Sequence, residues 1–133
     1  MAKFGNRSEL RLEQVHPALV EVLRDAIEII DFTIICGHRN KSDQNEAYAT
    51  NASHVKWPNS MHNTLPSLAV DIGPWPLDWR DTLAFARVYG VIEACAFQRD
   101  IALIWGGDWN GNGGSRDQTF MDIGHIEVVN IGP

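Results

Sequence analysis

Hydrophobic positions along the chain follow a helical period in some segments and form short apolar runs in others. After Pro17, which suits a first helical turn, the apolar residues recur at helical spacing to about Ile30. A short polar helix is predicted over residues 42–49, with Ser42 as its N-cap. A longer helix is predicted after Asp78, which we expect to cap it. Its expected buried side comprises Leu83, Ala86, Val91, Ala94, Cys95 and Phe97.

Four short runs rich in β-branched and other apolar residues predict strands. They comprise residues 32–36, 68–72, 101–105 and 125–129. Residues 50–66 and the glycine- and asparagine-rich residues 106–115 show no period and are expected to be loops. Because the strands do not alternate regularly with long helices, the pattern favours an α+β domain over a doubly wound sheet.

Length and charge narrow the range of functions. The 133 residues fit one domain, 1–133, in which residues 1–13 are a lead-in. The net charge of −6 argues against a protein that binds nucleic acid or an anionic membrane surface. No apolar run reaches transmembrane length, and the N-terminus lacks the apolar stretch of a signal peptide, so we expect cytoplasmic localisation until release. Cys36 and Cys95 are expected to be reduced core residues.

Two histidine-bearing segments concentrate the candidate chemistry. His62, Asp71 and His125 would supply three ligands and leave a position open for water, as a catalytic zinc site requires. Asp122 lies three residues before His125, close enough to take a proton from that water. Glu127 lies two residues after His125, on the same strand face, where it could orient a ligand. On spacing alone, turn and cap roles for Asp71 and Asp122 stay open.

A second candidate metal site lies in the glycine- and asparagine-rich loop. Asp108, Asn110 and Asn112, followed by Gly113, match the first half of a calcium-binding loop, in which oxygen ligands occupy alternate positions. The twelfth position, counted from Asp108, is Thr119 in place of the usual glutamate. The alternative is a turn-rich hairpin loop, for which Asn and Gly are the usual residues.

Several short motifs occur in an order that resembles one known family. They are Val15-His16-Pro17, Gly37-His38-Arg39 with Gln44, Ser60-Met61-His62, Ala69-Val70-Asp71, Trp105-Gly106-Gly107-Asp108-Trp109, Asp122-Ile123-Gly124-His125 and His125-Ile126-Glu127. Over about residues 14–129, the chain resembles the zinc D-Ala-D-Ala carboxypeptidase and L-alanyl-D-glutamate endopeptidase family, which includes phage endolysins. The resemblance implies a small α+β domain of the DD-peptidase/hedgehog-like type, with a central, mainly antiparallel sheet flanked by helices.

The resemblance also implies roles for the candidate residues. His62, Asp71 and His125 would bind zinc, and Asp122 would be the catalytic base. Arg39 would hold a substrate carboxylate or polarise the scissile carbonyl, because a guanidinium is permanently charged and makes paired hydrogen bonds.

Two further residues of the same motifs, Ser60 and Gln44, are candidates for substrate binding. The segment between His62 and Asp71 is two residues longer than is usual in the family, which we expect to alter the substrate groove. The remaining histidines have no matching partners and are not expected to be ligands; they are His16, His38 and His54.

The leading interpretation is a monomeric phage or prophage endolysin that cleaves peptidoglycan stem peptides after L-Ala. One alternative is a D-Ala-D-Ala carboxypeptidase of the same family, and another is a non-catalytic zinc-binding module on the same fold. The spare carboxylate of Asp122 argues against the module, because a structural zinc site needs four closed ligands and no base. The acidic net charge disfavours a nucleic-acid enzyme.

Overall fold

A four-stranded antiparallel sheet of order β1-β2-β4-β3 forms the centre of the molecule, and the computed structural model describes residues 2–114 and 121–131. The strands are β1 (Phe32–Cys36), β2 (Ala69–Pro74), β3 (Ala102–Gly106) and β4 (Asp122–Val129). The helices of the described part are α1 (Asn6–Leu12), α2 (Pro17–Ile27), α3 (Lys41–Ala49) and α4 (Thr82–Gln98). All four predicted strands are present, which confirms the α+β prediction, although β4 begins earlier than expected.

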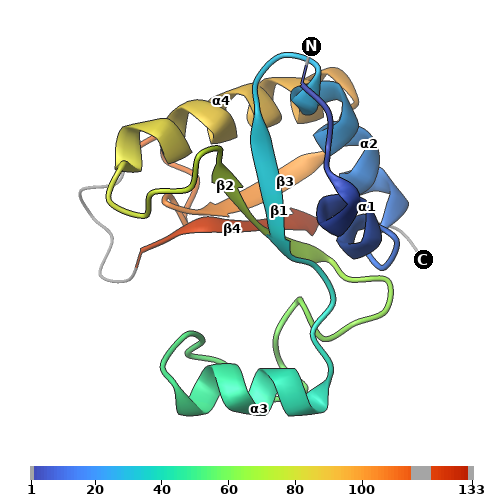
Figure 1. Ribbon diagram of the computed structural model, residues 1–133, viewed down its shortest axis with the longest axis vertical. Coiled ribbons are helices and arrows are strands. Elements are labelled where there is room, and N and C mark those ends of the chain that lie inside the picture. Colours follow the sequence, from blue (N-terminus) through green and yellow to red (C-terminus); the bar gives the residue numbers. More distant parts are fainter. Residues whose placement is uncertain (1, 115–120, 132–133) are drawn as a thin grey trace.

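The helices are distributed unevenly around the sheet. Helices α2 and α4 pack against each other, and α4 contacts three of the four strands, whereas α3 lies apart from both (Figure 1). The sheet therefore has one face covered by helices and another that is available for a site.

Within the described residues, no helix is long and apolar enough to cross a membrane.

Side-chain alternation along the central strands separates the core from this second face. Val70, Ile72 and Ile126 belong to the hydrophobic core that includes residues of α2 and α4. Asp71 and His125 occupy the intervening positions, and successive side chains of a strand point to opposite faces. The same alternation that builds the core thus delivers polar side chains to the other face.

Strand β1 lies at an edge of the sheet, and α1 covers it. The Ser8 hydroxyl accepts a hydrogen bond of 3.0 Å from the Ile34 N–H, and Arg11 donates one of 2.7 Å to the Ile34 carbonyl. These contacts satisfy edge groups that would otherwise be open to pairing with another chain. The sequence interpretation gave this segment no structure beyond a lead-in, so α1 is a correction.

A bulge near the end of β1 changes the position of Cys36. Ile34 pairs with Ile72, and the register then shifts so that Cys36 pairs with Asp71. An extra residue in one strand turns the following side chain toward the other face. Cys36 is therefore half-buried beside Asp71, which corrects its assignment to the core, whereas Cys95 is buried. Both are free thiols, as predicted.

Two helix caps differ from the predictions. Asn40, and not Ser42, caps α3, because its side chain accepts a hydrogen bond of 2.8 Å from a backbone N–H of the first turn. Asp81, and not Asp78, caps α4 through a hydrogen bond of 3.2 Å of the same kind. Each true cap lies immediately before the first helical residue, where its side chain reaches the unpaired N–H groups.

The buried face of α4 is rotated relative to the predicted one. The helix buries Phe85, Val88, Tyr89, Ile92, Cys95 and Ala96. Leu83 and Phe97, which were predicted to be buried, are 81% and 85% exposed. Ala86 and Ala94 are also exposed, and Val91 is only half-buried. Apolar residues occur all around this helix, so their spacing alone did not determine which side faces the core.

Candidate metal centre and active site

Side chains from two strands and one loop meet on the face of the sheet that α2 and α4 leave uncovered. Asp71 on β2 pairs with His125 on β4, which places their side chains next to each other. His62 comes from the loop before β2. Its N–H donates to the Ser60 hydroxyl at 3.1 Å, and its carbonyl accepts from the Arg39 N–H at 2.8 Å. The fold thus brings together the three residues that the sequence suggested as metal ligands.

One carboxylate oxygen of Asp71 contacts both imidazoles. Its Oδ1 lies 3.4 Å from His62 Nε2 and 3.4 Å from His125 Nδ1. These separations exceed the ~2.9 Å of an ordinary N–H···O hydrogen bond. Both His62 Nε2 and Asp71 Oδ1 are buried without a hydrogen-bond partner. Ligands of a tetrahedral divalent metal with bonds of about 2.1 Å lie about 3.4 Å apart, so each imidazole lies at a ligand-to-ligand distance from Asp71 Oδ1.

The second nitrogen of each imidazole has a partner of its own. His62 Nδ1 lies 2.7 Å from the Gly37 carbonyl, and His125 Nε2 lies 2.8 Å from Glu127 Oε1. A Cβ at Gly37 would lie 2.8 Å from the Arg11 carbonyl, so only glycine fits where His62 is held. Such contacts orient metal-binding histidines and leave the other nitrogen free to coordinate. Glu127 thus lies where it can orient the His125 ring.

Protons compete for the nitrogens that would bind a metal. Burial disfavours a charged His62, but its interactions with the Asp71 carboxylate and with Cys36 outweigh burial and raise the pKa of His62 to about 10. Asp71, together with Glu127, similarly overcomes burial and raises the pKa of His125 to about 9. Burial opposes ionisation of Asp71, yet the two imidazoles hold its pKa below the usual range. A metal ion that binds at neutral pH must therefore displace protons.

Asp122, the first residue of β4, adjoins this cluster. Its carboxylate, that of Asp71 and an imidazole nitrogen of His125 all lie within 4.8 Å of one another. Burial and the negative charge of Asp71 raise the pKa of Asp122 above its usual value. A raised pKa suits a carboxylate that must accept a proton and then release it.

Arg39 reaches the cluster from the segment between β1 and α3. Its guanidinium donates to Asp71 Oδ2 at 3.3 Å and to Gln44 Oε1 at 3.0 Å. Gln44 is fully buried, and its amide nitrogen donates to the Ser53 hydroxyl and the Val55 carbonyl. Because both ends of this amide are engaged, Gln44 positions Arg39 and does not face the cleft. This differs from the substrate contact predicted for Gln44.

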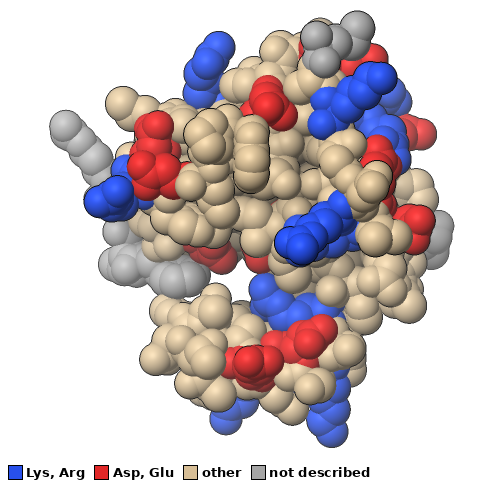
Figure 2. Space-filling model, viewed as in Figure 1, with Lys and Arg blue, Asp and Glu red and all other residues tan. Residues whose placement is uncertain are grey.

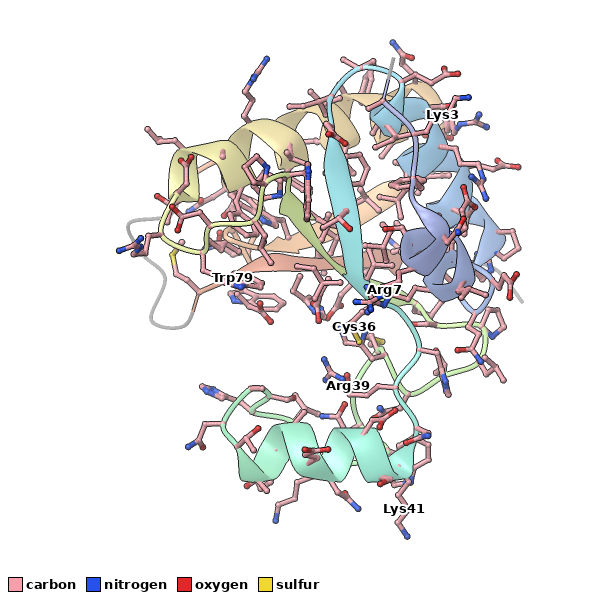
Figure 3. All side chains as sticks on the ribbon, in the orientation of Figure 1. Lys3, Arg7, Cys36, Arg39, Lys41 and Trp79 are labelled. Atoms are coloured by element: carbon pink, nitrogen blue, oxygen red, sulfur yellow. The ribbon has the colours of Figure 1, made fainter. Side chains whose placement is uncertain are left out.

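A cleft of about 160 Å³ lies over the cluster. Figure 2 shows the surface hollowed between the part formed by α3 and the body of the molecule, with acidic groups along one side of the hollow. Figure 3 shows Arg39 between α3 and the sheet. The lining includes Arg39, Ser60, His62, Trp109, Asp122 and His125. His54 also lines the cleft, which could not be predicted because its loop has no period.

The candidate calcium loop is organised by its own backbone. Asp108 Oδ2 accepts a hydrogen bond of 2.7 Å from the Gly113 N–H, and Asn110 Oδ1 accepts one of 3.2 Å from the Asn112 N–H. These hydrogen bonds are typical of a turn-rich hairpin loop, the alternative to a calcium site. Asp108 Oδ1, however, is buried and has no hydrogen-bond partner among the residues that the structure describes. Thr119 lies outside the described residues.

The fold is similar to that of a solved peptidase. The crystal structure of Serratia marcescens L-Ala D-Glu endopeptidase ChiX matches with a TM-score of 0.75 at 27% identity, over 95% of this chain and 90% of that one. Fold and site together define the class of the protein as a peptidase.

Sequence comparisons identify the family within this class. The family of phage L-alanyl-D-glutamate peptidases matches residues 1–129. The L-alanyl-D-glutamate peptidase of Escherichia phage T5 is 36% identical over 136 residues, which cover 96% of this chain and 98% of that protein. The chain belongs to the phage L-alanyl-D-glutamate peptidase family.

Proposed function

We propose that this protein is a zinc-dependent endolysin that hydrolyses the L-alanyl-D-glutamate bond of peptidoglycan stem peptides. Family membership supports the reaction and the substrate. The observation that carries the zinc centre is the position of Asp71 Oδ1, 3.4 Å from one nitrogen of His62 and 3.4 Å from one nitrogen of His125. Two imidazoles and a carboxylate suit zinc better than magnesium or calcium, which prefer oxygen ligands.

The metal ion and the residues around it would have separate roles in the hydrolysis. When bound, zinc supplies a Lewis acid that lowers the pKa of water toward ~7 and polarises the scissile carbonyl. Asp122 accepts the proton of the attacking water and delivers it to the leaving amine of D-glutamate. Arg39, held by Gln44, donates hydrogen bonds to the developing oxyanion or to a substrate carboxylate. Burial of the cluster strengthens these interactions by excluding water.

Cleavage of a defined stem peptide tests the assigned bond. Incubation of the zinc-loaded protein with an L-Ala-D-Glu-containing stem peptide should yield free L-Ala and a fragment that begins with D-Glu, identified by mass spectrometry. Release of terminal D-Ala would instead establish the carboxypeptidase alternative. A protein that binds one zinc per chain and gives no product would establish the non-catalytic module.

Calcium binding at Asp108 is a second, separate proposal. The unpartnered Asp108 Oδ1, with Asn110 and Asn112 two and four residues further on, supports it. A calcium ion there would order the loop that carries Trp109 beside His125, whose ring centroids are 5.4 Å apart. Millimolar calcium should then raise the melting temperature of the wild type and not of the Asp108→Ala variant. Equal responses of the two proteins would reject the site.

We further propose that the protein acts as a monomer and reaches the wall after release from the cytoplasm. The cleft is formed by one chain, and each candidate side chain comes from that chain. Light scattering should therefore give a mass close to 14.9 kDa. A larger mass at the concentrations used for activity would contradict the monomer.

A further inference from the structure

Cys36 lies beside the metal-binding cluster, and the function proposed above does not use it. Cys36 pairs with Asp71 across β1 and β2, and Asp71 pairs with His125 across β2 and β4. Paired positions of neighbouring strands place their side chains on the same face. The three side chains therefore form a row across the sheet. The bulge after Ile34 is what brings the cysteine into this row.

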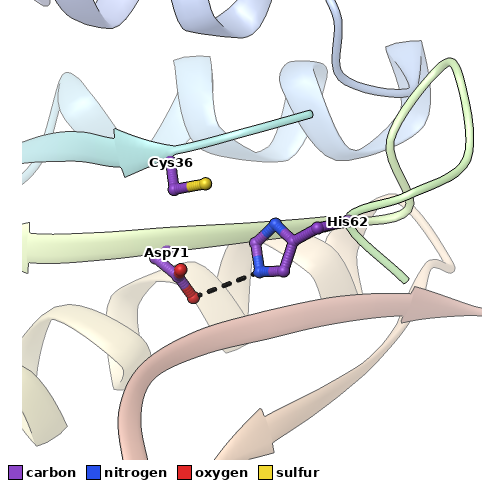
Figure 4. Close-up of side chains that lie close together, drawn as sticks. All are labelled: Cys36, His62 and Asp71. Carbon is purple, nitrogen blue, oxygen red and sulfur yellow. Dashed lines mark ion pairs between the residues drawn. The ribbon is translucent and has the colours of Figure 1, made fainter. Parts of the chain in front are cut away.

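The thiol belongs to a compact group of potential metal donors. Cys36 Sγ, an imidazole nitrogen of His62 and a carboxylate oxygen of Asp71 all lie within 4.8 Å of one another. Figure 4 shows the sulfur pointing toward the His62 ring. The His62 side chain is only 2% exposed, and its Nε2 has no hydrogen-bond partner. Asp71 Oδ1 is likewise buried and unpartnered, so two of the three groups have a free donor atom.

The surroundings of the sulfur leave it available to a metal. Its hydrogen bond to the Gly37 carbonyl is long, at 3.7 Å, and the same carbonyl lies 2.7 Å from His62 Nδ1. Cys36 does not line the cleft, unlike His62 and His125. The thiol thus approaches the cluster from the end of β1, and the side open to substrate stays free.

We propose that Cys36 is an additional donor of the metal centre, so that a thiophilic divalent cation held by His62, Asp71 and His125 also takes the Cys36 thiolate. The cation then keeps a fifth position for water, because zinc in catalytic sites can become five-coordinate. This inference rests on the metal centre of the proposed function. On binding, a sulfur–metal bond replaces the S–H bond, and the thiol proton passes to solvent. Sulfur donors favour soft cations, so the thiol biases the site toward zinc and cadmium over manganese and magnesium.

Cobalt substitution tests the inference without any activity measurement. Cobalt(II) added to the metal-stripped wild type should produce a near-ultraviolet thiolate-to-cobalt charge-transfer band. Cys36→Ser should abolish this band and weaken zinc binding about 10- to 100-fold, in line with the effect of losing a supporting group at a metal site. Cys95→Ser is the matched control, since Cys95 is the other free thiol and lies in α4. The charge-transfer band should be unchanged in this variant.

The outcomes separate this inference from the proposed function. Cobalt that binds to the wild type without a charge-transfer band, or a band that survives Cys36→Ser, overturns the thiol donor and leaves the zinc peptidase intact. Failure of the wild type to bind cobalt or zinc overturns both. If Cys36→Ser does not fold, alkylation of the wild type decides: zinc should slow labelling of Cys36, and an unchanged rate would reject the proposal.

Discussion

Asp71 is the residue on which the geometry of the site depends. Its Oδ1 lies between His62 and His125, and its Oδ2 accepts a hydrogen bond from Arg39. One carboxylate therefore sets the spacing of both imidazoles and the position of the guanidinium. Asp122 has a different environment: among the described residues its carboxylate lies near the cluster without comparable hydrogen bonds or ion pairs, and burial raises its pKa. Under the proposed function, this contrast suits Asp71 to the role of metal ligand and Asp122 to the role of base.

Replacement of Asp122 by Asn should remove catalysis and keep the metal. The amide preserves shape but cannot accept the proton of the attacking water, so kcat should fall about 10²- to 10⁴-fold. Bound zinc, measured by elemental analysis, should stay at one per chain. Wild-type turnover in this variant would show that another group is the base.

Metal binding should release protons at neutral pH. With a pKa of about 10 for His62 and about 9 for His125, both imidazoles are charged at pH 7 and must become neutral to bind zinc. Titration calorimetry in buffers of different ionisation enthalpy should give a release of about two protons per zinc from the imidazoles near pH 7, and about one more if the Cys36 thiol also binds. The release should decline as pH rises through 9 and 10. A value near zero at pH 7 would mean that Asp71 does not stabilise the charged imidazoles.

The candidate ligands could be predicted from motifs, whereas the residues that contact them depend on tertiary structure. His62, Asp71 and His125 were singled out because their residue types and order carry chemical meaning. Burial of Gln44 under Arg39 could not be predicted, since a glutamine in a polar helix is usually exposed. The position of Cys36 beside Asp71 was not predicted for a related reason. It depends on a bulge, and a bulge depends on the pairing of two strands, which the pattern of a single strand does not contain.

Elements with a clear period were predictable, and those defined by contacts were not. The β-branched run of β1 gave its bounds, Phe32–Cys36, directly. Helix α1 was missed because it is short and polar, and its role is to satisfy the edge of β1 through Ser8 and Arg11. Helix α4 was found with the wrong buried face, because apolar residues occur on all of its sides.

Two phenylalanines of α4 test this corrected orientation. Phe85 is fully buried and stacks against Trp79 with ring centroids 5.1 Å apart, whereas Phe97 is 85% exposed. Phe85→Ala should lower the free energy of unfolding by about 3–5 kcal/mol. Phe97→Ala, the matched control, should change it by less than about 0.5 kcal/mol. Urea denaturation measures both, and equal losses would contradict the orientation.

At the scale of the whole molecule, the site arises where two parts of the chain face each other. The sheet contributes Asp71, Asp122 and His125, and the segment around α3 contributes Arg39 and His62. Residues far apart in the sequence meet only because β4 inserts between β2 and β3. Sequence patterns predicted the parts, but the strand order and the cleft follow from packing.

Digestion of purified peptidoglycan, with and without a chelator, would show both the bond that is cut and whether its cleavage needs a metal. We expect stem-peptide fragments with a new D-Glu N-terminus, lost on chelation and restored by zinc. The same fragments at an undiminished rate in the metal-stripped protein would contradict a metal centre built from His62, Asp71 and His125.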